Sequence, residues 1–166
     1  QHKQAFKVIC KALNAKVDGT STGLDVLAFP TGAGKTKALE YYASKTSASV
    51  LIVARRTDDA DEIAKNINAL SDDEGIACAS HSKRRLALED IQEFRVLVIT
   101  HEAYKRMILC SDPYHAGLNN SYLGGKRELH VIDESMNIFE TEEITLLQAK
   151  TAIESLTPQD ANAFKP

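Results

Sequence analysis

Short apolar runs alternate along this chain with longer segments in which apolar residues recur every three or four positions. The apolar runs are rich in Val, Ile and Leu and end at polar or turn residues, which is typical of strands covered on both faces of a sheet. The predicted strands are Val26–Phe29, Ser49–Ala54, Ile76–Ala79, Arg95–Thr100 and Leu129–Asp133. Strands that alternate with helices predict an α/β domain with a mostly parallel central sheet and helices on both faces.

Helices are predicted where one side of the segment is apolar at helical spacing. Residues 2–13 show such a side, formed by Phe6, Ile9 and Leu13. The other predicted helices cover 35–44, 57–70 and 101–109, with two short helical segments after residue 135. In the helix over 57–70 we expect Thr57 or Asp58 as the cap and the following residues inside: Ala60, Ile63, Ile67 and Leu70. Polar, glycine-containing stretches predict loops over 18–23 and 111–125.

Composition fits one folded domain. The 166 residues are 43% hydrophobic and 26% charged, which is enough for a single core. A net charge of −3 gives no general attraction to polyanions, so any nucleic-acid contact has to be local. No apolar run approaches the length of a membrane span. Cys10, Cys78 and Cys110 lack metal-ligand spacing, so we expect them to be buried thiols in a cytoplasmic protein. Because the first residue is Gln1 and not Met, we expect the numbering to begin inside a longer product.

A glycine-rich segment lies between a predicted strand and a predicted helix, which is the setting of a phosphate-binding loop. Its residues are Pro30, Thr31, Gly32, Ala33, Gly34, Lys35 and Thr36. Glycines let the backbone curl so that its N–H groups surround a phosphate, and the following helix adds the positive end of its dipole. Lys35 would neutralise phosphate oxygens of ATP, and the Thr36 hydroxyl would hold Mg²⁺. The alternative is a glycine-rich turn that merely precedes a lysine-bearing helix.

Two carboxylates follow the last predicted strand, about a hundred residues after the glycine-rich segment. In nucleotide-dependent motors one acid at a strand end holds Mg²⁺ and the next polarises the attacking water. Asp133 fits the first role, as a metal ligand. Glu134 fits the second role, so Glu134 and Lys35 are the two candidate catalytic residues. The alternative is that both acids simply cap a helix that begins at Ser135.

Together these two segments resemble the first RecA-like domain of the superfamily 2 DExD/H-box helicases and translocases. Residues 30–36 resemble motif I of that family, and residues 131–136, with the sequence Val-Ile-Asp-Glu-Ser-Met, resemble motif II. The resemblance implies a three-layer P-loop NTPase fold, ATP and Mg²⁺ as cofactors, and DNA or RNA as a partner of the full-length motor. The family has Asp or His at the fourth position of motif II, where Met136 cannot make the polar contact that links motif II to motif III.

Further segments are similar to family elements that meet nucleic-acid phosphates. Arg55 and Arg56 follow a predicted strand where motif Ia lies, and Thr100 and His101 begin a block that resembles the family's Thr-Pro/His-Glu element. A solvated helix entrance is the alternative for the arginines, and a plain helix cap is the alternative for Thr100.

Two weaker candidates lie outside these segments. Gln4 is the candidate for the glutamine that reads adenine in the family, against an ordinary surface glutamine. The cluster Lys83–Arg85 is a candidate polyanion contact, against a solvated charged surface.

The family places one more strand, which ends in motif III, between the phosphate-loop strand and the acidic-pair strand. Residues 135–166 show no such strand in their sequence pattern, so we expect residues 1–166 to be a single but incomplete domain. The second RecA-like domain and its arginines would also be missing, which predicts weak turnover. A nucleotide-binding switch or scaffold without motor activity, and a P-loop ATPase outside the helicases, remain alternatives.

Overall fold

The computed structural model describes residues 2–109, 112–118 and 121–136, all of which belong to one compact unit covering residues 1–136. Its centre is an entirely parallel sheet with the strand order β2-β3-β1-β4. The strands are β1 (Val50–Ala54), β2 (Ala77–Ala79), β3 (Val96–Thr100) and β4 (Leu129–Ile132). The prediction of a parallel α/β sheet is therefore confirmed.

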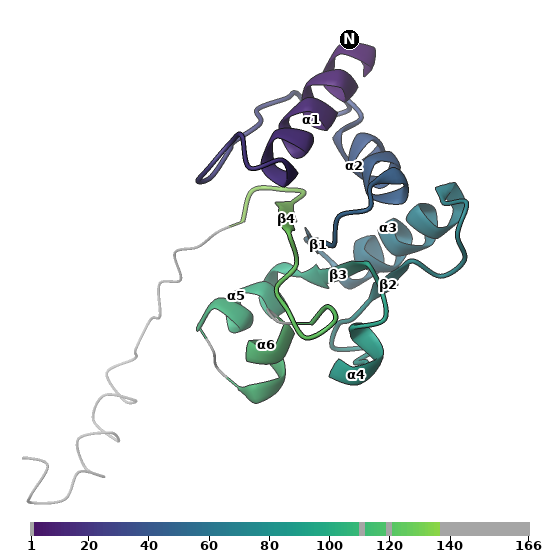
Figure 1. Cartoon of the computed structure of the whole chain (residues 1–166), viewed down its shortest axis with the longest axis vertical. Helices are drawn as coiled ribbons and strands as arrows, with labels where there is room; N and C mark the ends of the chain where they lie inside the picture. The colour runs from purple at the N-terminus through teal and green to yellow at the C-terminus, as the bar shows by residue number, and fades with distance from the viewer. Residues whose placement is uncertain (1, 110–111, 119–120, 137–166) are drawn as a thin grey trace, which may run out of the picture. The chain divides into compact units, whose positions relative to one another are not determined.

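Helices cover both faces of the sheet and form a three-layer arrangement (Figure 1). One face is covered by α1 (His2–Val17), α2 (Lys35–Lys45) and α3 (Thr57–Leu70). The other face is covered by α4 (Leu88–Ile91), α5 (His101–Leu109) and α6 (Pro113–Leu118). In β1, Val50 and Ile52 pack toward the first group of helices, while Leu51 and Val53 pack toward the second. This alternation in a strand that is buried throughout explains its unbroken apolar sequence.

The predicted strand Val26–Phe29 is wrong, because these residues have no regular structure. Leu24 and Val26 are 86% and 81% exposed, although both are large apolar residues. A strand needs a neighbour for its backbone hydrogen bonds, and β4 pairs with β1 alone among the described residues. Residues 26–29 therefore have no strand to pair with in this part of the chain.

Smaller differences have local causes. The predicted loop over 111–125 contains α6, in which Leu118 is buried against the second face and Asp112 accepts a hydrogen bond from the His115 backbone N–H. Neither expected cap of α3 forms, since Arg56 stands at that position without a side-chain bond. Leu70 is exposed because it lies at the end of the helix, whereas the other predicted inward residues of α3 are buried.

The cysteines follow the expectation of buried thiols in part. Cys78 is buried in β2, and burial raises the pKa of its thiol to about 12. Cys10 is partly buried in α1. Cys110 and the helical segments predicted after residue 136 lie outside the described residues.

Candidate functional site

The glycine-rich segment forms a tight turn that leads into α2. The Ala33 backbone N–H donates to the Pro30 carbonyl oxygen at 3.2 Å, which closes the turn. Gly32 and Gly34 have φ values of 77° and 82°, in the left-handed region that favours glycine. A side chain added at Gly32 would meet nothing within 4 Å, so the backbone at this point is open to an approaching group. The turn therefore leaves the first N–H groups of α2 accessible at its entrance.

The Lys35 ammonium group lies against the same turn. It donates hydrogen bonds to the carbonyl oxygens of Phe29 and Pro30, both at 3.3 Å. Both acceptors are neutral, and Lys35 forms no ion pair with a described carboxylate. Its positive charge is thus held at the turn without a directly paired carboxylate, as an anion-binding lysine would be.

Thr36 and Asp133 meet directly, although they are 97 residues apart in the sequence. The Thr36 hydroxyl donates to Asp133 Oδ2 at 2.8 Å. The Asp133 backbone N–H bonds the Val53 carbonyl oxygen at 3.1 Å and so continues the β4–β1 ladder by one residue. The first turn of α2 and the carboxyl end of β4 are therefore joined at one point.

Burial raises the pKa of the Asp133 carboxyl group, and the nearby Glu134 carboxylate adds to this effect. The hydrogen bond from Thr36 and the charge of Lys35 act in the opposite direction. A cation bound here would relieve the cost of burying the carboxylate. Hydroxyl and carboxylate oxygens are ligands that Mg²⁺ prefers, so Thr36 and Asp133 fit this ion. Since no described cluster brings together three His, Cys, Asp or Glu side chains, such an ion would depend on further ligands from substrate or water.

Glu134 lies beside Asp133 and is more exposed. Its carboxylate forms an ion pair with Arg55, in which Nη1 and Oε2 are 3.7 Å apart. His101, which follows β3, is close enough to Glu134 and Arg55 for their charges to act on its ring. Partial burial lowers the pKa of the His101 ring, and Arg55 and Lys105 add to this decrease while Glu134 and Asp133 oppose it. The structure thus brings together Arg55, His101 and Glu134 at the carboxyl ends of β1, β3 and β4.

Thr100 caps α5, which is the structural alternative for this residue. Its hydroxyl oxygen accepts the backbone N–H of Ala103 at 3.3 Å, and the side chain is buried. We expect Thr100→Ala to lower the free energy of unfolding by about 1 kcal/mol, because the substitution leaves a helix N–H without its acceptor. Urea unfolding measures this loss. Thr100→Ser keeps the hydroxyl and should retain most of the stability, and an equal loss in both variants would contradict the capping role.

Arg56 and Gln4 are less closely tied to the site. Arg56 is exposed and stands immediately before α3. Gln4 lies near the start of α1, a helix that packs against α2 and β4. The predicted roles of both residues, a phosphate contact for Arg56 and an adenine contact for Gln4, stay predictions.

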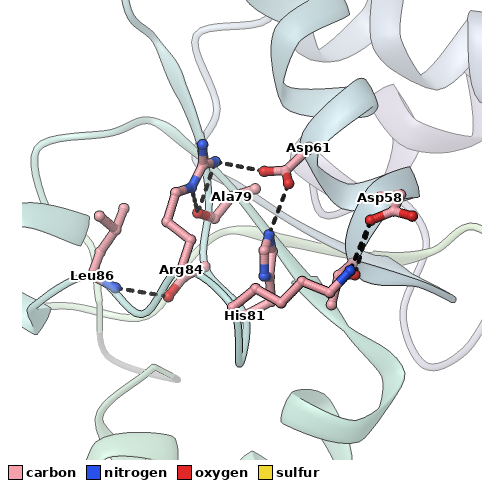
Figure 2. A network of polar contacts seen from close by, with 9 residues as sticks. Asp58, Asp61, Ala79, His81, Arg84 and Leu86 are labelled. Carbon is pink, nitrogen blue, oxygen red and sulfur yellow. Dashed lines mark hydrogen bonds and ion pairs between the residues drawn. The ribbon is translucent and has the colours of Figure 1, made fainter.

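The basic cluster Lys83–Arg85 makes contacts within the chain. Figure 2 shows Arg84 beside Asp61 and the Ala79 carbonyl oxygen. Lys83 pairs with Asp58 at 3.2 Å, and Arg84 pairs with Asp61 at 2.8 Å and also donates to the Ala79 carbonyl oxygen. The Arg85 guanidinium lies 3.7 Å from the centre of the Tyr114 ring. These contacts support a structural role for the cluster more than the predicted polyanion contact.

Sequence reasoning missed the part that Asp61 and His81 play in this network. Asp61 in α3 also interacts with His81 Nε2 at 3.1 Å, and the backbones of His81 and Arg84 exchange two hydrogen bonds. The turn after β2 is thereby attached to α3. The partners come from separate elements and follow no sequence period, so the pattern contained no signal for them.

Neither a comparison with models of protein families nor one with curated proteins found a match for this chain. Among the described residues, no helix combines the length and the apolar character needed to cross a membrane. The structure accordingly supports an α/β domain with a parallel four-stranded sheet, and the family resemblance stays a prediction.

Proposed function

We propose that this chain is the ATP-binding, RecA-like domain of a nucleic-acid-dependent motor ATPase of the superfamily 2 helicase and translocase kind. The observation that carries the proposal is the 2.8 Å hydrogen bond between Thr36 and Asp133. It joins the end of a glycine-rich turn to an acid at the carboxyl end of a parallel strand, the edge at which open α/β sheets bind their ligands. If the glycine-rich turn merely preceded a helix, this contact with the acid would not be expected.

The residues have distinct roles in this proposal. The N–H groups of Gly32 and Gly34 and the Lys35 ammonium group bind the β- and γ-phosphates. Thr36 and Asp133 hold Mg²⁺, which supplies charge neutralisation at the phosphates when it is bound. Glu134, one residue further along, orients the attacking water and accepts its proton. Gln4 is the proposed adenine contact.

The polymer would bind along the same edge of the sheet. Arg55 and Arg56 follow β1, and His101 begins α5 directly after β3. Both α3 and α5 start here, so their N-terminal N–H groups lie beside the arginines, while Asp58, Asp59 and Glu102 in the same first turns offset part of the positive charge. Contacts of this kind read the phosphate backbone and carry no base specificity, so they leave open whether the polymer is DNA or RNA.

A nucleotide-binding switch without motor activity is the second candidate. It is favoured by the exposed, irregular residues 24–28, which leave the segment before the phosphate loop outside the sheet. Met136 at the end of the acidic segment also lacks the polar group expected of a motor. Such a protein would bind ATP but would not respond to a polymer.

The ATPase rate of the intact protein separates these candidates. It should be measured with ATP and Mg²⁺ alone and then with single-stranded DNA, duplex DNA and RNA. We expect strong stimulation by one of these polymers. A flat response combined with tight ATP binding would favour the switch, and failure to bind ATP would refute both candidates.

We expect Glu134→Gln to keep nucleotide binding and to reduce turnover by about 100-fold or more, the range in which a lost general base is felt. The amide has the shape of the carboxylate but does not accept the proton of water. Nucleotide affinity and steady-state turnover should be measured on the same preparation. The matched control is Glu89→Gln, which makes the same change on an exposed position of α4. Normal turnover by Glu134→Gln would overturn the role of Glu134.

A further inference from the structure

We propose that Arg55 is a positioning residue that holds Glu134 in an ion pair, and that a phosphate of single-stranded nucleic acid breaks this pair by taking over the arginine. The inference rests on the proposed function, and it makes one arginine both the sensor of the polymer and the restraint on the candidate catalytic acid.

The sheet register makes Arg55 and Glu134 neighbours. β1 and β4 are adjacent and parallel, with Val53 aligned to Ile132. Arg55 lies two residues after Val53, and Glu134 lies two residues after Ile132. The hydrogen bond from the Asp133 N–H to the Val53 carbonyl oxygen continues the ladder in this direction. Aligned residues of neighbouring strands lie on the same side of a sheet. The backbone therefore places Arg55 and Glu134 side by side, within reach of an ion pair.

The ion pair is loose enough to be exchanged. The 3.7 Å separation of Nη1 and Oε2 is longer than a hydrogen bond, and the side chains of Arg55 and Glu134 are 63% and 55% exposed. Exposed pairs of this kind contribute little to stability. A phosphodiester offers the guanidinium two oxygens in a bidentate arrangement, which is the geometry that arginine prefers. A bound polymer can thus outcompete the Glu134 carboxylate.

Breaking the pair would change the chemistry of Glu134. The ion pair holds a carboxylate oxygen of Glu134 toward the guanidinium group, whereas an unpaired carboxylate can turn and accept a hydrogen bond from water. Glu134 forms no second ion pair among the described residues, so withdrawal of Arg55 leaves its carboxylate free for water. Hydrolysis would then accelerate when the polymer binds. This coupling would not need the polar contact that Met136 is unable to make.

A double-mutant cycle on polymer binding tests this without relying on turnover. Fluorescently labelled single-stranded DNA and RNA oligonucleotides are titrated with the native chain, Arg55→Ala, Glu134→Gln and the double variant, and anisotropy is recorded. We expect Glu134→Gln to bind about three- to fivefold tighter, as expected for release of an exposed ion pair. In the Arg55→Ala background the same change should have almost no effect. Equal effects in both backgrounds would indicate general repulsion and would overturn the inference.

Asp133→Asn is the matched control, because it removes the same charge one residue away without an ion pair to Arg55. Its effect on oligonucleotide affinity should be the same with and without Arg55. In the intact protein, Arg55→Ala should also raise turnover without polymer, and Arg55→Lys should restore the low rate, since it keeps the positive charge. A low rate in Arg55→Ala would contradict the restraint.

Failure of this inference is distinguishable from failure of the proposed function. If no variant binds either nucleotide or oligonucleotide, the proposed function falls and the inference falls with it. If nucleotide and oligonucleotide bind but the double-mutant cycle is additive, the proposed function stands and Arg55 does not restrain Glu134.

Discussion

Lys35→Ala should weaken nucleotide binding severely, to the point of abolishing it at the upper end of the expected loss, while leaving the domain folded. In the structure the Lys35 ammonium group makes two long hydrogen bonds to neutral carbonyl oxygens, which contribute little to stability. Against the phosphates of a nucleotide the same group would be one half of a close charge pair. Losing one partner of such a pair costs roughly 2–5 kcal/mol, which corresponds to an affinity about 30-fold to more than 1000-fold weaker.

Isothermal titration with ATP and Mg²⁺ measures this effect, and thermal unfolding of the same samples checks the fold. Lys45→Ala is the matched control, because Lys45 is the last residue of the same helix and pairs with Asp72 on the surface at 2.7 Å. We expect Lys45→Ala to bind nucleotide as the native chain does. If Lys35→Ala also bound normally, the glycine-rich turn would not be a phosphate-binding loop.

The sequence predicted the central strands well because their environment is simple. Residues such as Leu51, Ile52 and Val98 are buried on both faces of a parallel sheet, and this condition produces an unbroken apolar run. The run at 26–29 has the same appearance but no partner strand among the described residues. Local pattern reports how apolar a segment is, whereas strand formation also requires a hydrogen-bonding neighbour from elsewhere in the chain.

The candidate site was predictable only in part for a related reason. Thr36 and Asp133 were named because the glycine-rich turn and the acidic pair each carry a recognisable spacing, and the structure brings the two side chains together. The ion pair between Arg55 and Glu134 depends on strand order, which places β1 next to β4. The contacts of Asp61 and His81 depend on how a turn packs against a helix. Neither arrangement leaves a period in the sequence.

An arginine in a polar segment of the sequence is one of the most buried polar residues in the described part of the chain. Arg127 is 4% exposed and forms no ion pair with a described carboxylate. Its guanidinium group donates to the Ser121 hydroxyl and to a set of backbone carbonyl oxygens, those of Ile91, Phe94, Arg95 and Ser121. Burial lowers the pKa of Arg127 to about 10, so the group is still charged at neutral pH. This arginine attaches the segment before β4 to the segment before β3.

We expect Arg127→Met to lower the free energy of unfolding by about 3 kcal/mol or more. The Ile91 and Arg95 carbonyl oxygens have other donors, the N–H groups of Phe94 and Val50. The carbonyl oxygens of Phe94 and Ser121 have no second donor among the described contacts, and each buried acceptor left without one costs roughly 1–3 kcal/mol. The loss of the Ser121 hydroxyl contact adds to this cost.

Urea unfolding of Arg127→Met measures the loss, with Lys126→Met as the matched control on the neighbouring exposed cation. Surface changes of that kind usually stay within about 0.5 kcal/mol of the native stability. Arg127→Lys should also be strongly destabilised, because one ammonium group does not reach acceptors on both sides as the planar guanidinium does. If Arg127→Lys were as stable as the native chain, charge alone would explain the residue. A loss below about 1 kcal/mol in Arg127→Met would mean that water replaces the guanidinium at these carbonyl oxygens.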